Sequence, residues 1–210
     1  MAAHERSVAR RATWRPAWVR PWPRGGRLSA RVRALDDRVD AWAERHRNPR
    51  LDHLFYGLSS AADHGLLWFS LGAVRAARAA DPAPALRLGA AMAIESAVTN
   101  GPIKACFRRI RPPHEPEGLL PYGMHRPRTS AFPSGHATSA FTAATLLAAG
   151  TRRGSLYFVL AALVATSRVY TRMHHASDVF AGVALGLAFG QAARRLLPVQ
   201  PPRRGRARTP

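Results

Sequence analysis

Apolar residues are concentrated in the middle of this 210-residue chain, in runs that contain no charged side chain. No Asp, Glu, Lys or Arg occurs within 129–151, 154–167 or 179–193. Uncharged runs are typical of membrane-spanning helices, although the last two are short for a span of about 20 residues. We therefore predict an all-α, membrane-embedded bundle of about five to six helices. The candidate spans lie near residues 54–74, 85–103, 135–151, 154–168 and 178–196.

Residues 31–47, ahead of the first candidate span, have helical spacing. Leu35, Val39 and Trp42 fall on one face of that helix, and its acidic residues fall elsewhere. This pattern predicts an amphipathic helix that could lie in the membrane interface. The acidic residues in question are Asp36, Asp37, Asp40 and Glu44.

Both ends of the chain are strongly basic, and the formal net charge is +20. Residues 1–30 are rich in Trp, Pro and Arg, which suits either the headgroup region of a bilayer or a solvated, poorly ordered tail. Residues 198–210 form a second basic tail. Such a charge suits nucleic acid, an anionic membrane surface or a phosphorylated substrate. Because the middle is apolar, we favour a small membrane protein, with one folded domain over 31–197.

Three short segments combine the residue types of a phosphate-binding site. Lys104, Arg111 and Arg168 supply cationic donors, and an arginine can bind two phosphate oxygens at once. Lys104 is the single lysine of the chain, whose other basic residues are arginines. Ser134 and Gly135 lie where a loop enters the next predicted helix, and free N–H groups at a helix N-terminus bind anions. The segments are 104–112, 133–136 and 167–178.

Two histidines suit phosphoryl transfer. His174 and Asp178 are four residues apart, which on a helix puts both on one face. Asp178 could then accept a hydrogen bond from one ring nitrogen and leave the other as a nucleophile. His175 has a similar spacing to Asp178, so periodicity leaves the choice between the two histidines open. His136, from a different helix, could protonate the leaving oxygen.

Together these segments resemble the type 2 phosphatidic acid phosphatase (PAP2) family, in its bacterial membrane lipid phosphatase branch. The family pattern, K-x6-R-P, then P-S-G-H, then S-R-x5-H-x3-D, is present in order over residues 104–178. The resemblance implies that His174 is the nucleophile that becomes phosphorylated, that His136 is the general acid and that Asp178 orients His174. It implies no metal and no cofactor. The phosphate-binding set that it implies is Lys104, Arg111, Ser134, Gly135 and Arg168.

The resemblance predicts an integral-membrane lipid phosphatase that cleaves a phosphate or diphosphate ester without a metal. The expected substrates are a polyprenyl diphosphate, phosphatidic acid, phosphatidylglycerol phosphate or a phosphorylated sugar linked to a polyprenol. The expected partners are this lipid and membrane lipids, and no nucleic acid. One alternative is a vanadate-dependent haloperoxidase-like enzyme, but such proteins are larger and soluble. A basic, non-enzymatic membrane scaffold is another, and it leaves the three segments unexplained.

Several further polar residues need an interpretation. Asp63, His64 and Glu95 fall inside candidate spans, as either structural pairs within the bundle or groups that support the site residues, and we favour structural pairs. Arg108 and Arg109 belong to a long basic loop, where such side chains are usually solvated. We assign none of these residues to the site.

The distribution of basic residues also predicts sidedness in the cell membrane. The turn at 152–153 and the C-terminal tail should be cytoplasmic, which with five spans puts the site on the non-cytoplasmic face. Five spans would also put the basic N-terminus outside, whereas basic segments usually lie on the cytoplasmic side. We therefore favour an N-terminus inside and six membrane-associated helices.

Overall fold

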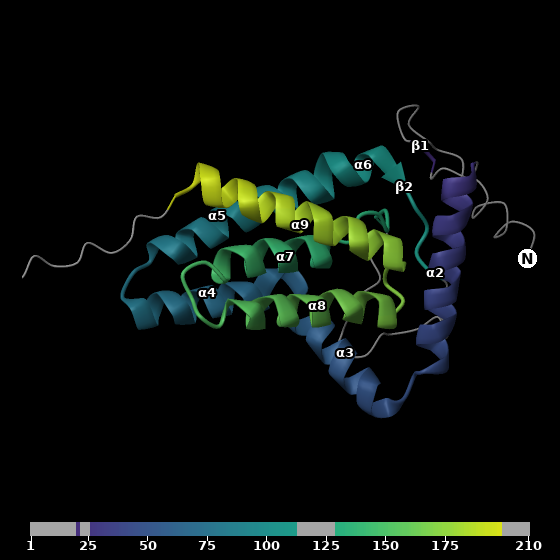
Figure 1. Ribbon diagram of the computed structural model, residues 1–210, viewed down its shortest axis with the longest axis horizontal. Coiled ribbons are helices and arrows are strands. Elements are labelled where there is room, and N and C mark those ends of the chain that lie inside the picture. The colour runs from purple at the N-terminus through teal and green to yellow at the C-terminus, as the bar shows by residue number, and fades with distance from the viewer. Residues whose placement is uncertain (1–19, 22–25, 113–128, 199–210) are drawn as a thin grey trace, which may run out of the picture.

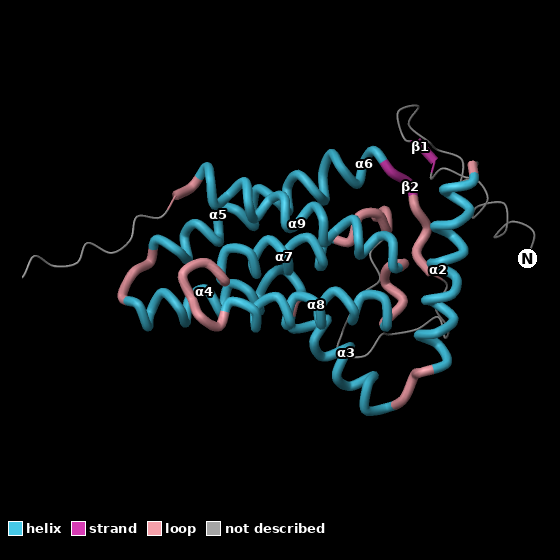
Figure 2. The backbone as a smooth tube through the Cα atoms, viewed as in Figure 1, coloured by secondary structure: helices cyan, strands magenta, loops and turns pink. Residues whose placement is uncertain are grey.

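The computed structural model describes residues 20–21, 26–112 and 129–198, and it confirms the all-α prediction (Figures 1 and 2). Most residues of the two predicted basic tails lie outside these ranges. Two very short strands, β1 (Arg20–Pro21) and β2 (Phe107–Arg108), pair in parallel. The longer helices are α2 (Arg27–Arg45), α3 (Pro49–Ala61), α4 (Leu66–Ala79), α5 (Ala83–Val98), α7 (Gly135–Leu147), α8 (Gly154–Tyr170) and α9 (Ala176–Leu196). The short helical turns are Asp63–Gly65, Thr99–Ile103 and α6 (Lys104–Cys106).

The central helix of the bundle is α7, which contacts α4, α5, α8 and α9. Nine of its 13 residues are buried, and most of them are Ala or Thr. Such small side chains let neighbouring helices approach closely. Figure 1 shows these helices extending along the long axis of the molecule, with α2 crossing one end of the bundle.

Helix α9 packs against α7 through three glycines spaced one turn apart, Gly182, Gly186 and Gly190. A methyl group added at Gly182 would lie 2.6 Å from the carbonyl oxygen of Ser134, and one at Gly190 would lie 2.5 Å from Thr145 Cβ. Both distances are well below van der Waals contact, so the two helices can be this close only without side chains there. This packing also fixes the relative position of the N-terminal ends of α7 and α9.

Capping side chains set where two helices begin. Asn48 accepts a hydrogen bond from the backbone N–H of Leu51 at 3.1 Å, and Pro49 occupies the first turn of α3. Asp178, in the first turn of α9, accepts from the backbone N–H of His175 at 2.9 Å. A carboxylate at this end also complements the positive end of the helix dipole.

The stretch predicted as a span near 54–74 is divided between α3 and α4, which meet at a bend. His64 (φ 54°) and Gly65 (φ 76°) both take the left-handed conformation at the bend, which a right-handed helix cannot continue through. The bend brings the turn that contains Asp63 against α7.

Helix α2 presents its acidic face to the bundle and its apolar face outward. Asp36 and Asp40 are only 1% and 7% exposed, whereas Leu35 and Trp42 are 48% and 52% exposed. The orientation is the reverse of that of a helix on a water-soluble core. It follows that the inward face of α2 must meet polar groups of the bundle.

Within the described ranges, one helix, α9, is both long enough and apolar enough to cross a membrane. Helix α8 is apolar but shorter, with 17 residues. Length and composition alone therefore give limited evidence of a membrane protein.

Candidate active site

The three segments singled out in the sequence meet at the end of the bundle that α2 crosses (Figure 1). The backbone N–H of Ser134 donates to the carbonyl oxygen of Asp178 at 3.0 Å, which ties the starts of α7 and α9 together. The N–H groups of Met173 and His174 both donate to the carbonyl oxygen of Arg168 at 3.1 Å. The loop between α8 and α9 therefore folds back onto the end of α8.

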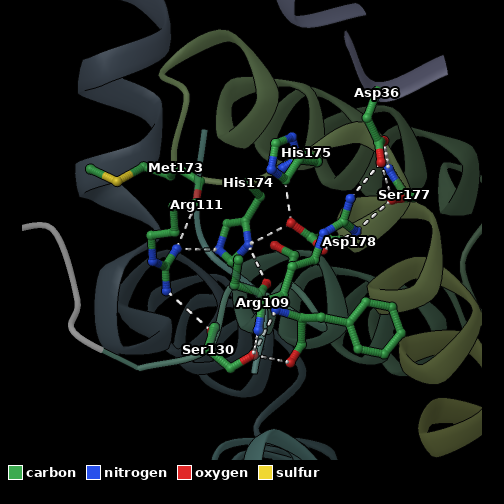
Figure 3. A network of polar contacts seen from close by, with 12 residues as sticks. Asp36, Arg109, Arg111, Ser130, Met173, His174, His175, Ser177 and Asp178 are labelled. Atoms are coloured by element: carbon green, nitrogen blue, oxygen red, sulfur yellow. Dashed lines mark hydrogen bonds and ion pairs between the residues drawn. The ribbon is translucent and has the colours of Figure 1, made fainter. Parts of the chain in front are cut away.

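His174 lies in this loop, and both of its ring nitrogens have partners (Figure 3). Nδ1 is 2.7 Å from the carbonyl oxygen of Ala131, which can only accept a hydrogen bond, so Nδ1 carries the ring proton. Nε2 is 3.1 Å from a guanidinium nitrogen of Arg111, which can only donate, so Nε2 holds a lone pair. The two contacts define one neutral tautomer, with its unprotonated nitrogen facing a cation. This is the form of histidine that can attack a phosphorus atom.

The surroundings of His174 favour the same neutral form. The ring is 2% exposed, and burial disfavours a charged imidazolium. Burial and the positive charges of Arg168, Arg111 and Lys104 hold the pKa of His174 well below its usual range. The Nε2 lone pair is thus available at neutral and mildly acidic pH.

Asp178 does not lie where helical spacing predicts. The nearest approach of its carboxylate to His174 Nδ1 is 3.8 Å, which is longer than a hydrogen bond. Its oxygens instead accept from the His175 N–H at 2.9 Å and from Arg109 at 2.6 Å. The expectation that His174 and Asp178 share one helical face is wrong, because α9 begins at Ala176. Asp178 holds the start of α9 and places a negative charge near the ring.

Three cations act on the His174 ring through their charges. Besides Arg111, they are Arg168, which is buried and donates to the hydroxyl of Ser59, and Lys104, which donates to Asn100 Oδ1 at 2.8 Å. Among the residues that the structure describes, none forms a hydrogen bond with Arg168 Nε. Burial and the charges of Arg111 and Arg168 lower the pKa of Lys104 to about 8. An anion bound among these groups would relieve their mutual repulsion.

The N-terminus of α7 adjoins the same cations. A methyl group added at Gly135 would lie 3.6 Å from Lys104 Nζ, so this glycine borders the ammonium group. Ser134 is fully buried, and its hydroxyl has no hydrogen-bond partner within the described part of the chain. First-turn amides of a helix lack partners inside the helix and attract anions. Amides, a hydroxyl and cations are thus combined in a form that suits a phosphate group.

His136, in the first turn of α7, pairs with a carboxylate that sequence reasoning did not assign to the site. Its Nε2 is 2.7 Å from Asp63 Oδ1, in the turn between α3 and α4. Glu95, by contrast, accepts from the hydroxyl of Ser139 at 2.7 Å inside the bundle. Of these two acids, Asp63 is the one that forms a hydrogen bond with a predicted site residue in the described part of the chain.

Arg109, interpreted from the sequence as a solvated loop residue, is buried in a network of charges (Figure 3). Its guanidinium bridges Asp36 at 2.5 Å and Asp178 at 2.6 Å. In the structure, buried and exposed residues alternate over 107–111 as in a strand, a pattern that the sequence does not show because Ile110 is on the exposed side. That alternation puts Arg109 on the same buried side as Arg111.

The structure also separates the two adjacent histidines. His175 Nδ1 is 2.9 Å from Asp40 Oδ2 on α2, and its side chain is half-buried. His174 instead faces Arg111 and the other site cations. The two rings, which helical spacing did not separate, therefore have different surroundings.

The family model of the PAP2 superfamily matches residues 84–201, more than half of the chain and all three segments. The chain belongs to the PAP2 superfamily. This confirms the resemblance drawn from the motifs, and it makes the protein a phosphatase of the PAP2 type.

One protein with an assigned activity is similar to this PAP2 phosphatase in sequence. It is the decaprenylphosphoryl-5-phosphoribose phosphatase of Mycobacterium tuberculosis, matched in strains CDC 1551 and H37Rv. The two sequences are 36% identical over 137 residues, which are 64% of this chain and 73% of the relative.

Two crystal structures have a similar fold. A transmembrane PAP2 type phosphatidylglycerolphosphate phosphatase from Bacillus subtilis has a TM-score of 0.65 and 22% identity, over 79% of this chain and 86% of that one. LpxE from Aquifex aeolicus has a TM-score of 0.61 and 26% identity, over 75% of this chain and 93% of that one. Both likenesses support the helical fold.

Proposed function

We propose that this PAP2 phosphatase releases phosphate from a polyprenyl-linked lipid phosphate, through a covalent phosphohistidine on His174. The observation that carries the proposal is the state of the His174 ring. It is buried and neutral, and its unprotonated Nε2 is 3.1 Å from Arg111. A nucleophile held next to phosphate-binding cations is the minimum that phosphoryl transfer to a side chain requires.

In this mechanism the substrate phosphate occupies the site between the cations and the start of α7. Arg111, Arg168 and Lys104 neutralise its charge, and the Ser134 hydroxyl and the first-turn amides at Gly135 donate to its oxygens. The proposal needs no metal ion. The cations also counter the charge that develops on the equatorial oxygens in the transition state.

The reaction then proceeds in two displacements. His174 Nε2 attacks phosphorus, a P–N bond forms, and the P–O bond to the lipid breaks. His136 supplies the proton that the departing alkoxide takes. In the second step His136 accepts a proton from water, the water oxygen attacks phosphorus, and the P–N bond breaks to release inorganic phosphate. Nδ1 keeps its proton throughout, and the carbonyl of Ala131 supports the positive charge of the phosphorylated ring.

A lipid substrate is supported by the surface as well as by the relatives. Helices α8 and α9 carry large apolar side chains that face outward, and contact with acyl chains would bury them. These exposed residues include Leu156, Val159, Leu163, Phe180 and Leu187. We propose a multi-pass membrane domain over 31–197, with its site on the non-cytoplasmic face.

The proposed substrate class follows from the sequence relative. The Mycobacterium tuberculosis protein, 36% identical, is named for a decaprenylphosphoryl phosphoribose, which is a polyprenyl-linked sugar phosphate. We place this chain with that class, ahead of polyprenyl diphosphates, phosphatidic acid and phosphatidylglycerol phosphate.

The experiment is a substrate panel with the full-length protein purified in detergent. Release of inorganic phosphate is measured from a polyprenylphosphoryl 5-phosphosugar, a polyprenyl diphosphate and phosphatidic acid. We expect the highest kcat/KM with the first and loss of turnover in His174→Ala, with His175→Ala as the matched control that retains it. Turnover by His174→Ala would overturn the mechanism. A preference for the diphosphate would overturn the substrate class and leave the mechanism standing.

A further inference from the structure

Three acidic residues of α2, each one helical turn from the next, contact the loop that carries His174. Asp36 accepts from the backbone N–H of Ser177 at 2.9 Å, Asp40 pairs with His175 at 2.9 Å, and Glu44 pairs with Arg172 at 2.8 Å. We propose that α2 positions the nucleophile loop (residues 171–175) together with the first turn of α9, and that Asp36 is the positioning residue on which the geometry of this loop depends. This inference rests on the proposed role of His174.

Asp36 differs from the other two acids in its burial and in the number of groups that it holds. Its carboxylate accepts from the N–H of Ser177, from the Ser177 hydroxyl at 2.7 Å and from Arg109 at 2.5 Å. The Ser177 hydroxyl also accepts from Arg109, at 2.6 Å. One buried carboxylate thus fixes both the start of α9 and a buried guanidinium.

The path from Asp36 to His174 is short. Arg109, held by Asp36, donates to one oxygen of Asp178 at 2.6 Å, and the other oxygen of Asp178 accepts the His175 N–H at 2.9 Å. His175 is joined to His174 by a single peptide bond. A displacement of Arg109 therefore reaches the nucleophile through two hydrogen bonds and that bond (Figure 3).

Charge explains why Asp36 is needed. Asp36 and Asp178 are both buried and share one guanidinium, and a buried ion is stable only with partners. In Asp36→Asn the remaining amide oxygen can still accept the Ser177 N–H, but the NH2 group in place of Oδ2 would face two donors, the Ser177 hydroxyl and Arg109. Arg109 would then shift toward Asp178. Phosphoryl transfer tolerates such shifts poorly, because a misplacement of about 1 Å can lower a rate about 100-fold.

No family motif covers α2, since the PAP2 match begins at residue 84 and α2 ends at Arg45. Two explanations of its acidic face can be separated by measurement. If α2 only helps the chain fold, loss of the Asp36 charge lowers the amount and the melting temperature of folded protein. If Asp36 positions the loop, the folded enzyme itself becomes slower.

The test compares Asp36→Asn with Asp36→Glu and with Asp37→Asn in the full-length enzyme. Asp37 is the matched control, because it is adjacent, carries the same charge and is exposed. With dioctanoyl phosphatidic acid as probe, we expect Asp36→Asn to lower kcat about 10- to 100-fold with KM within about twofold. We expect Asp36→Glu to recover part of this loss and Asp37→Asn to match the wild type.

A second measurement needs no turnover. Hydrogen exchange of the peptide that covers 171–178 should be faster in Asp36→Asn than in the wild type, and unchanged in Asp37→Asn. The inference would be overturned if Asp36→Asn had the same kcat per folded molecule and the same exchange rate as the wild type. If Asp36→Asn does not fold, Ser177→Ala removes only the hydroxyl and should change kcat and exchange in the same direction. If kcat and exchange of Ser177→Ala then equalled those of the wild type, the inference would also be overturned.

Failure of the proposed function can be distinguished from failure of the inference about Asp36. If the wild type released no phosphate from any lipid, or if His174→Ala remained active, the mechanism would be wrong. The exchange comparison would still decide whether Asp36 orders the loop.

Discussion

His174 donates its Nδ1 proton to the backbone carbonyl of Ala131 at 2.7 Å, and the carboxylate of Asp178 lies 3.8 Å from the same nitrogen. The tautomer of the ring is therefore set by the backbone, which no side-chain substitution removes. Asp178 contributes through charge and through the start of α9. This division of roles makes the consequences of substituting the two residues unequal.

Asp178→Asn should be less damaging than His174→Ala. An asparagine oxygen can still accept the His175 N–H, whereas the charge that faces Arg109 is lost. Loss of one charge-assisted hydrogen bond costs about 1.5–3 kcal/mol, so kcat should fall about 10- to 100-fold. Phosphate release from a lipid substrate is the measurement. Equal loss in both variants would mean that Asp178 bonds the ring directly during turnover.

We expect the fall of kcat/KM at alkaline pH to follow the deprotonation of Lys104. Because its pKa is lowered to about 8, the free enzyme loses this charge as the pH rises through about 8 rather than above 10. A neutral amine binds phosphate less well, so kcat/KM should fall with rising pH over that range. Lys104→Arg keeps its charge and should extend the plateau to higher pH. If kcat/KM of Lys104→Arg fell over the same pH range as that of the wild type, the titrating group would not be Lys104.

Asp63→Asn should impair protonation of the leaving group, because it removes the carboxylate that orients His136. General acid catalysis contributes about 100- to 10,000-fold for a poor leaving group, and orientation is part of that effect. We expect kcat/KM to fall at least about 10-fold for a lipid phosphate and much less for p-nitrophenyl phosphate, whose leaving group needs no proton. His136→Ala should show the same leaving-group dependence. Equal losses with both substrates would contradict this role.

Gly186→Ala should destabilise the bundle, because a methyl group there would lie 2.9 Å from Phe141 Cβ and would also meet the backbone of Thr138. Overpacking costs about 1–3 kcal/mol, against a gain of up to about 1 kcal/mol in helix propensity. The melting temperature in detergent should fall. Gly89→Ala is the control, since nothing lies within 4 Å of its added methyl group, and its melting temperature should be maintained or raised. A stable Gly186→Ala protein would show that α7 and α9 can separate without loss.

The residues of the motifs could be found from the sequence, because their types and spacings are local. Uncharged runs also predicted the regions of α7, α8 and α9. The bend between α3 and α4 had a visible signal in Asp63-His64-Gly65, but its φ angles depend on packing that a sequence pattern does not contain. The roles of His174 and His175 could not be separated by spacing, since the difference lies in their contacts with Arg111 and Asp40.

The carboxylates that support the site were harder to predict. Asp36 lies 73 residues from Arg109, and Asp63 lies 73 residues from His136. Such pairs leave no trace in local periodicity. Amphipathic reasoning also assumes that the polar face of a helix meets solvent, and α2 reverses that assumption because its polar face meets buried charges.

The position of α2 has a practical consequence for where this protein can be divided. A recombinant fragment cut at the start of the family match, residue 84, would retain every motif residue. It would lose Asp36, Ser59 and Asp63, which contact Arg109, Arg168 and His136. Such a fragment would keep the signature by which the family is recognised and lack the upstream groups that contact the proposed site and the arginine beside it.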